Sequence, residues 1–217
     1  MDQDLINTYI FDCDGVILNS NKVKTNAFYN AGLTYGQKKA ELLKKYHVEN
    51  GGISRYLKFE YFLRDIVQKD FCADEIEILL TKFGDEVKKG LLASNVAEGL
   101  KEFRDKTRGS RWMIVSGGDQ KELREVFEQR GLIEMFDGGV FGSPATKEEI
   151  LEREMLNHNI IMPALLFGDS KYDHFAAVCA GIDFMFVSNW TEVDEWMSWT
   201  AQNNINYIHQ LSDFLSQ

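Results

Sequence analysis

This sequence contains few cysteines and no long apolar run. Its three cysteines, Cys13, Cys72 and Cys179, are an odd number without a Cys-x-x-Cys pair, so they provide no disulfide framework. No apolar run approaches the length that crosses a membrane. Residues 1–4 are acidic and lack the basic region and the apolar stretch of a signal peptide. These absences predict a reduced, cytoplasmic protein.

Basic residues are also fewer than acidic residues. The 217 residues include 24 Lys and Arg against 34 Asp and Glu, which gives a net charge of −10. Nucleic acids and anionic membranes are bound through basic patches, so this balance predicts neither as a partner. Apolar residues (44%) and charged residues (27%) occur at the frequencies of an ordinary globular protein. The length suits one large domain, or a domain with an insertion, with a substantial core.

Four short apolar runs have the composition of buried parallel strands. They occupy residues 7–11, 111–116, 164–168 and 182–187, and a weaker run lies at 139–141. From residue 97 onward, amphipathic helical patterns separate these runs. This alternation predicts an α/β fold with a doubly wound, Rossmann-like parallel sheet.

Residues 17–91 interrupt the alternation. They contain no strand pattern but two apolar stripes at the three–four spacing of an amphipathic helix, within residues 56–66 and 76–87. We therefore predict an α-helical cap at 17–91, inserted into a catalytic core that consists of 1–16 and 92–217. The linkers are expected near residues 16–20 and 89–95.

Two carboxylates follow the first predicted strand. Asp12 and Asp14 lie within Asp-Cys-Asp-Gly, directly after the apolar residues 9–11. Side chains at i and i+2 of an extended backbone point to the same side, so both acids can converge while Cys13 points away and Gly15 permits a sharp turn. Two close carboxylates repel each other unless a cation or a proton intervenes. This geometry is typical of a magnesium-assisted nucleophile with an acid/base partner.

Further polar residues end or follow later strands. Ser116 ends the second predicted strand, where its hydroxyl and the following N–H groups, including that of Gly117, can hold phosphate oxygens. Lys147 precedes an acidic helix start and can neutralise a negative centre as a point charge. Asp169 and Asp173 follow another strand and supply carboxylates at the same edge of the sheet. Each motif is weak alone, but the ordered set is hard to obtain by accident.

Together, these motifs resemble those of the haloacid dehalogenase superfamily, in the branch with an α-helical cap between the first strand and the second motif. The resemblance covers essentially the whole chain. Residues 11–20 are similar to the opening of phosphoglycolate phosphatase-like and β-phosphoglucomutase-like members, and residues 131–137 resemble the family's segment after the second motif. The four motifs fall on Asp12 and Asp14, Ser116, Lys147, and Asp169 and Asp173.

The resemblance implies a magnesium-dependent phosphomonoester hydrolase that acts on a small phosphorylated metabolite, such as a sugar phosphate. Asp12 is the implied nucleophile, which becomes an aspartyl phosphate, and Asp14 is the implied acid/base. Mg²⁺ is expected on Asp12, on Asp169 and on the backbone carbonyl of Asp14. The residues expected to stabilise the phosphate oxygens are Ser116, Gly117 and Lys147.

Two positions leave alternatives open. Asp173 either ligates the metal, directly or through water, or orients Lys147. Arg55 lies where related caps place a phosphate-contacting Arg, which makes it a candidate substrate-binding residue. The alternative is an exposed Arg near the start of a helix.

The choice of reaction also has alternatives. Lys24 stands where phosphosugar mutases of the β-phosphoglucomutase type carry a cap His, which disfavours a mutase without removing it. Asp14 disfavours dehalogenation and phosphonate cleavage, because members with those activities lack this Asp or replace it. A non-catalytic binding module that kept the fold is the alternative from another class. The intact acids and Lys147 count against it, since binding alone does not need them.

Overall fold

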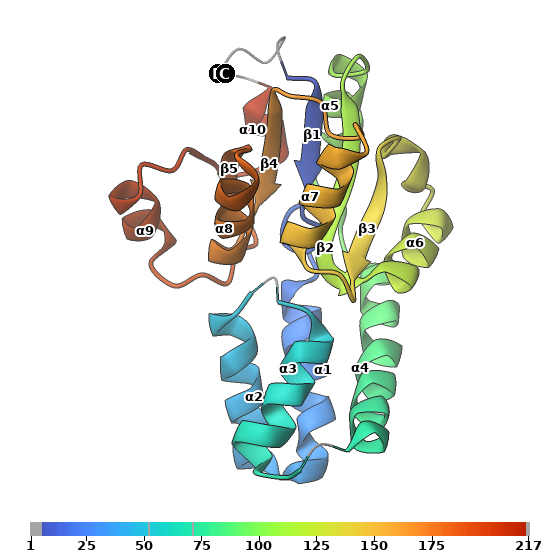
Figure 1. Ribbon diagram of the computed structural model, residues 1–217, viewed down its shortest axis with the longest axis vertical. Helices are drawn as coiled ribbons and strands as arrows, with labels where there is room; N and C mark the ends of the chain where they lie inside the picture. The colour runs from blue at the N-terminus through green and yellow to red at the C-terminus, as the bar shows by residue number, and fades with distance from the viewer. Residues whose placement is uncertain (1–5, 52, 71, 216–217) are drawn as a thin grey trace.

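The computed structural model describes residues 6–51, 53–70 and 72–215, so the acidic residues 1–4 lie outside it. Figure 1 shows two parts: a sheet flanked by helices, and a bundle of helices that lies beyond one end of the strands. The strand arrows point toward that bundle, so the carboxyl ends of the central strands meet it. Ligands of open α/β sheets bind at this edge.

The described residues form a sheet of six parallel strands in the order β3-β2-β1-β4-β5-β6. The strands are β1 Thr8–Phe11, β2 Arg111–Asp119, β3 Gly139–Ser143, β4 Ala164–Gly168, β5 Asp183–Val187 and β6 Tyr207–Ile208. The predicted α/β fold is confirmed, and all five predicted runs are strands. Strand β2 continues beyond Ser116, with a register shift between Val115 and Asp119. Strand β6 was not anticipated, because two residues carry no periodic pattern.

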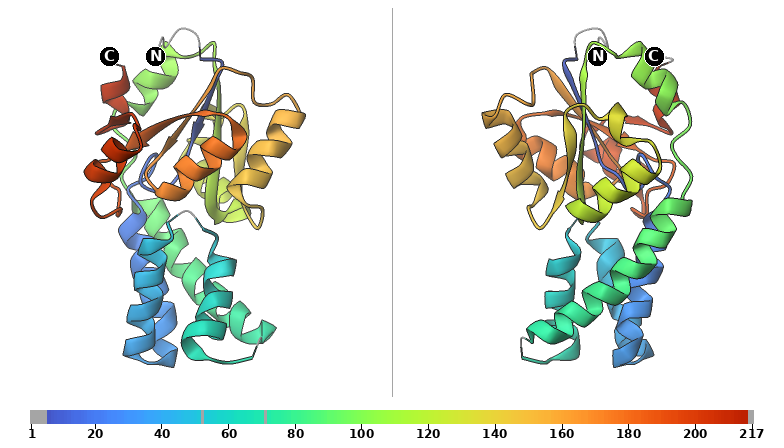
Figure 2. Two further views of the ribbon diagram at one scale, coloured as in Figure 1. Left: turned by 60° about the vertical axis from the view of Figure 1, so that its left-hand side comes forward. Right: turned by 90° about the vertical axis from the view of Figure 1, so that its right-hand side faces the viewer.

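Helices cover both faces of the sheet (Figure 2). In β1, Tyr9 and Phe11 belong to one hydrophobic cluster and Ile10 to another, as the two-residue period of a strand requires. The helices around the sheet are α5 Leu100–Lys106, α6 Gln120–Gln129, η4 Ile133–Met135, α7 Lys147–Leu156, α8 Lys171–Ala180, α9 Trp196–Gln202 and α10 Leu211–Phe214. The Tyr9 face packs against α5, α6 and α10, and the Ile10 face against α7 and α8.

The bundle beyond the sheet edge is helical, as the sequence pattern predicts for this region. It contains α1 Asn21–Gly32, η2 Leu33–Tyr35, α2 Gln37–Glu49, α3 Arg55–Tyr61, the π-helical turn η3 Phe62–Val67, and α4 Ala73–Ala93. Buried aromatic rings such as Phe28, Phe59 and Phe83 pack at its centre. Helix α4 runs without a break to Ala93, so most of the linker expected at 89–95 is helical. We retain the division into a core and a cap at 17–91 as a proposal.

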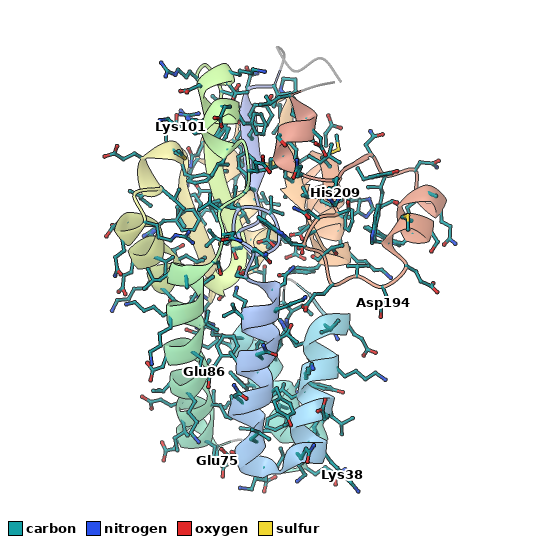
Figure 3. The ribbon with its side chains drawn as sticks, turned by 180° about the vertical axis from the view of Figure 1, so that it is seen from behind. Lys38, Glu75, Glu86, Lys101, Asp194 and His209 are labelled. Atoms are coloured by element: carbon teal, nitrogen blue, oxygen red, sulfur yellow. The ribbon has the colours of Figure 1, made fainter. Side chains whose placement is uncertain are left out.

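Charged side chains cover the outside of the helical bundle. Lys38 on α2 and Glu86 on α4 are exposed (Figure 3), and Glu86 accepts a hydrogen bond from the side chain of Asn30 on α1 over 2.9 Å. Within residues 6–51, 53–70 and 72–215, no helix has both the length and the apolar character that a membrane span requires.

Candidate active site

Three buried carboxylates converge where β1 and β4 end. Asp12 follows β1, Asp169 follows the neighbouring strand β4, and Asp173 lies in the first turn of α8. One carboxylate oxygen from each lies within 4.8 Å of the others. The three residues are 0–5% exposed, so little solvent screens their mutual repulsion. Parallel pairing of β1 with β4 therefore brings together acids that are 157 positions apart in the sequence (12 and 169).

The turn after β1 is tightened by Gly15. Its φ of +76° lies in the left-handed region, and its N–H donates to the carbonyl of Leu18 over 2.8 Å. A Cβ at this position would lie 2.0 Å from Oδ2 of Asp169 and 2.5 Å from Nδ2 of Asn21. Because Gly15 has no side chain, the Asp12–Asp14 loop can lie directly against the carboxylate of Asp169.

Lys147 supplies the positive charge beside the acids. It is the first residue of α7, whose start is fixed by a capping box between Thr146 and Glu149. Its Nζ lies 3.0 Å from Oδ1 of Asp12 and forms a second ion pair with Asp173. Burial alone would lower the pKa of Lys147, but the two carboxylates outweigh it and raise that pKa, so the amine is charged.

Asp173 uses both of its carboxylate oxygens within the protein. Oδ1 accepts from Lys147, and Oδ2 accepts from the N–H and the hydroxyl of Ser170 over 3.1 and 2.6 Å. Asp173 is also the N3 residue of the capping box that starts α8. These contacts favour the alternative in which Asp173 orients Lys147 over the one in which it ligates a metal directly.

The local charge balance fits a divalent cation. Asp12, Asp169 and Asp173 bring three potential negative charges to a site where Lys147 contributes one positive charge. Burial, only partly offset by Lys147, raises the pKa of Asp12 to about 7. Burial and then the charge of Asp12 raise the pKa of Asp169 well above its ordinary value. Carboxylate oxygens are the ligands that Mg²⁺ prefers, and a bound cation would allow both acids to ionise.

Asp14 is held apart from this cluster. Its Oδ1 accepts from the hydroxyl of Ser20 over 2.6 Å, and its Oδ2 forms an ion pair with Lys24 of α1. Burial by itself would raise the pKa of Asp14, but Lys24 and then Ser20 lower it below its ordinary value. The two acids of the first motif therefore occupy different environments, which is how one site can keep two carboxylates in different roles.

The second motif contributes mainly backbone to the cavity. Ser116 is fully buried in β2, and its hydroxyl accepts the N–H of Gly118 over 3.0 Å. Gly117 lines the cavity beside Asp12, whereas Ser116 is not among the lining residues. The hydroxyl of Ser143 donates to the carbonyls of Gly117 and Gly118 over 3.0 Å each, which fixes the loop.

Arg55 is buried, with 6% of its surface exposed, so its interpretation as an exposed residue is wrong. It begins α3 and its guanidinium donates to both carboxylate oxygens of Glu122 on α6, over 3.0 and 2.6 Å. The guanidinium also lies 4.7 Å from the ring centroid of Phe83. Arg55 lines the cavity, as expected of a substrate-binding residue, but its charge is matched by Glu122.

Sequence reasoning missed several polar residues of the helical bundle that line the same cavity: Asn21, His47 and Lys58. It noted Lys24 but not its contact with Asp14. Asn21 donates to Oδ2 of Asp169 over 2.6 Å. A helical signal was available, because Asn21 and Lys24 are three residues apart on α1 and therefore share a face.

Substitution Gly15→Ala should remove activity without unfolding the protein. The new Cβ would clash with the carboxylate of Asp169 and force the Asp12–Asp14 loop out of position, at a backbone conformation that alanine disfavours. We expect turnover to fall at least ~100-fold, because small displacements of reacting groups cost about that much. Steady-state kinetics and circular dichroism would measure both effects. Gly36→Ala, which also has a positive φ but no atom within 4 Å of the added Cβ, is the matched control.

Comparison with known proteins agrees with this geometry. A family model described as haloacid dehalogenase-like hydrolase matches residues 9–187. Similar solved structures include a predicted phosphatase from Clostridium acetobutylicum (20% identity, 97% of this chain and 96% of that chain, TM-score 0.74). Another is a predicted phosphoglycolate phosphatase from Haemophilus somnus (19% identity, 97% of each chain, TM-score 0.72).

No curated protein matches the chain at a significant level. At identities near 20%, the structural likeness shows the fold alone. The family model carries the assignment, because its match extends from β1 through β5. The chain belongs to the haloacid dehalogenase-like hydrolase family.

Proposed function

We propose that the protein is a magnesium-dependent phosphomonoesterase that forms an aspartyl phosphate on Asp12 and acts on a small phosphorylated metabolite. The observation that carries this proposal is the position of Asp12. It lies between Lys147 and the carboxylate of Asp169, beside a cavity that Asp14 and Gly117 also line. A nucleophile, an acid/base, a fixed cation and metal ligands thus meet at one point.

The contacts of Asp12 suit attack on phosphorus. Its Oδ1 accepts the N–H of Cys13 over 2.8 Å and an N–H of Lys147, which leaves Oδ2 as the attacking oxygen. Magnesium, when bound by Asp12, Asp169 and the carbonyl of Asp14, would supply positive charge to the phosphate oxygens. Lys147 and the backbone at Gly117 would stabilise the remaining charge.

Asp14 would handle the protons. It would donate a proton to the leaving oxygen and then accept one from the water that hydrolyses the aspartyl phosphate. The lowered pKa of Asp14 favours its ionised form, which the second step requires. For the first step Asp14 would take up a proton from water, which the negative charge of a bound phosphate would favour by raising that pKa. Ser20 and Lys24 hold the carboxylate in one orientation for both steps.

Phosphate release from a panel of phosphorylated metabolites would test the proposal. We expect release from at least one ester with Mg²⁺, loss of release in EDTA, and recovery on adding Mg²⁺. Conversion of a hexose 1-phosphate into the 6-phosphate without phosphate release would instead identify a phosphosugar mutase. A protein that binds these esters and turns over none would be a binding module.

Mg²⁺ should stabilise the protein more at pH 8 than at pH 6. The folded-state pKa values of Asp12, about 7, and Asp169 are raised. Such groups contribute stability below their unfolded pKa, and that stability is lost as pH rises through the folded pKa. At pH 8 the buried acids of the metal-free protein are therefore ionised, and bound Mg²⁺ offsets their unfavourable charge. At pH 6 protons compete with Mg²⁺ for the same carboxylates.

Thermal unfolding with EDTA or with Mg²⁺ at both pH values would measure this difference. Asp183→Asn removes an exposed carboxylate at the start of β5 and should leave the Mg²⁺-dependent shift in Tm unchanged. An equal shift at pH 6 and pH 8 would contradict the assignment of these acids as metal ligands.

A further inference from the structure

Four cationic side chains are buried in the described part of the chain, and three of them are paired with carboxylates. Lys147 pairs with Asp12 and Asp173, Lys24 with Asp14, and Arg55 with Glu122. Lys58 is 1% exposed and has no carboxylate within ion-pair distance among the described residues. The proposed chemistry uses none of its atoms.

The groups in contact with the amine of Lys58 carry no charge. Its Nζ lies 2.7 Å from Nδ1 of His47 and 5.4 Å from the ring centroid of Phe28. Burial, followed by the nearby charge of Lys24, lowers the pKa of Lys58 to about 7, and the carboxylates of Asp14 and Glu192 offset this only in part. Burial and then Lys58 lower the pKa of His47 well below its ordinary value, so the imidazole is neutral. His47 therefore offers a hydrogen bond but no compensating charge.

A buried cation without an anionic partner is costly, and buried groups with strongly shifted pKa values that lie in a cleft cluster at functional sites. The position of Lys58 matches this rule. Lys58 and His47 line the same cavity as Asp12 and Asp14. The cation comes from α3 and the imidazole from α2, so both belong to the cap helices that lie opposite the strand-terminal acids (Figure 1).

We propose that Lys58, assisted by His47, binds a carboxylate group of the substrate while the phosphate group lies against Asp12 and Lys147. This inference rests on the proposed phosphomonoesterase function and narrows it: the substrates are small phosphorylated carboxylic acids. A carboxylate would bring the single negative charge that Lys58 lacks. It would accept hydrogen bonds from the ammonium, as charge-assisted pairs do.

The charge of the cavity favours a carboxylate over a second phosphate. Glu192 also lines the cavity, where its carboxylate accepts from the hydroxyl of Thr25 over 2.7 Å. A second phosphate dianion would face this carboxylate with only one unpaired cation to offset it.

A matched pair of esters would test the subsite. 3-Phosphoglycerate and glycerol 3-phosphate share a three-carbon skeleton and differ in a carboxylate against a hydroxymethyl group. We expect the wild-type protein to prefer the carboxylate in kcat/KM by at least ~30-fold, the lower end of what one buried charge pair contributes. In Lys58→Met this preference should fall to within about threefold, mainly through a higher KM for 3-phosphoglycerate. Lys38→Met, on the exposed surface of α2, should keep the wild-type preference.

The change in Tm on Lys58→Met separates a binding role from a purely structural role, because the two roles predict changes of opposite sign. At pH 6, below the pKa of about 7, Lys58→Met replaces a buried charged amine by an apolar chain of similar length. The Tm of the free protein should therefore rise, by ~2–4 °C or more, while carboxylate recognition is lost. A lower Tm in Lys58→Met, together with an unchanged substrate preference, would overturn the proposal.

Calorimetry separates failure of the subsite from failure of the proposed reaction. Phosphonoacetate carries a carboxylate and ethylphosphonate does not, and neither has an ester bond to hydrolyse. With Mg²⁺ present, tighter binding of phosphonoacetate that is lost in Lys58→Met would support the subsite even if no ester is turned over. Equal binding of both phosphonates to the wild-type protein would overturn the subsite, whatever the phosphatase assays show.

Discussion

Asp12→Asn is expected to lower phosphate release by at least ~10⁴-fold. An amide does not attack phosphorus, so no aspartyl phosphate can form. The substitution keeps the shape of the side chain and its acceptor oxygen for the N–H of Cys13 and for Lys147. The loss should therefore lie in kcat and not in folding.

Stability separates a chemical effect from a structural one. Because burial raises the pKa of Asp12 to about 7, the ionised carboxylate at pH 8 is an unfavourable buried charge, and the neutral amide should leave Tm unchanged or higher. Asp183→Asn, at an exposed position, serves as the control for activity and Tm. If folded Asp12→Asn retains more than trace magnesium-dependent release, another group must be the nucleophile.

Lys147→Met is expected to reduce both activity and stability. The side chain is 1% exposed and bridges two carboxylates, so its removal leaves Asp12 and Asp173 without a cation. Breaking a buried pair in this way costs about 3–5 kcal/mol, which corresponds to a fall in Tm of roughly 6–20 °C for a protein of this size. Loss of one charge-stabilising donor should also reduce kcat by ~10²–10³.

A double variant tests the cause of that instability. In Lys147→Met with Asp173→Asn, one of the two stranded carboxylates is gone, so we expect part of the lost Tm to return while kcat stays low. Lys121→Met, at an exposed position on α6, provides the comparison for removal of a lysine. If Asp173→Asn changes Tm by the same amount with Lys147 present and with Lys147→Met, the two residues are not energetically coupled.

The sequence alone determined the strands of the sheet and the acidic residues that follow them in the site. Strands that are buried on both faces must be apolar throughout, so β1, β2, β4 and β5 were visible as short apolar runs. Because parallel strands end at a common edge, acids placed directly after β1 and β4 had to approach each other, as Asp12 and Asp169 do. Lys147 was identifiable through its place in the ordered motifs, although its contact with Asp173 was one of two alternatives.

Features that depend on how the helical bundle packs against the sheet were not predictable in this way. Helical periodicity shows that α1 to α4 are amphipathic, but it does not tell which polar residue faces the cavity. The pairing of Lys24 with Asp14 and the burial of Arg55 against Glu122 are contacts across this boundary. The extension of β2 past Ser116 likewise depends on a neighbouring strand.

Lys58 illustrates this limit most clearly. In the sequence it is one lysine among the charged residues of an amphipathic helix, where a solvated position is the ordinary expectation. The packing of α3 against α1 and α2 buries it beside His47 and Phe28, and no carboxylate of the described residues forms an ion pair with it. The periodicity of a sequence fixes which residues share one face of an element. The charged side chains next to a buried group come from other helices and strands, so only the tertiary structure decides whether that group is paired.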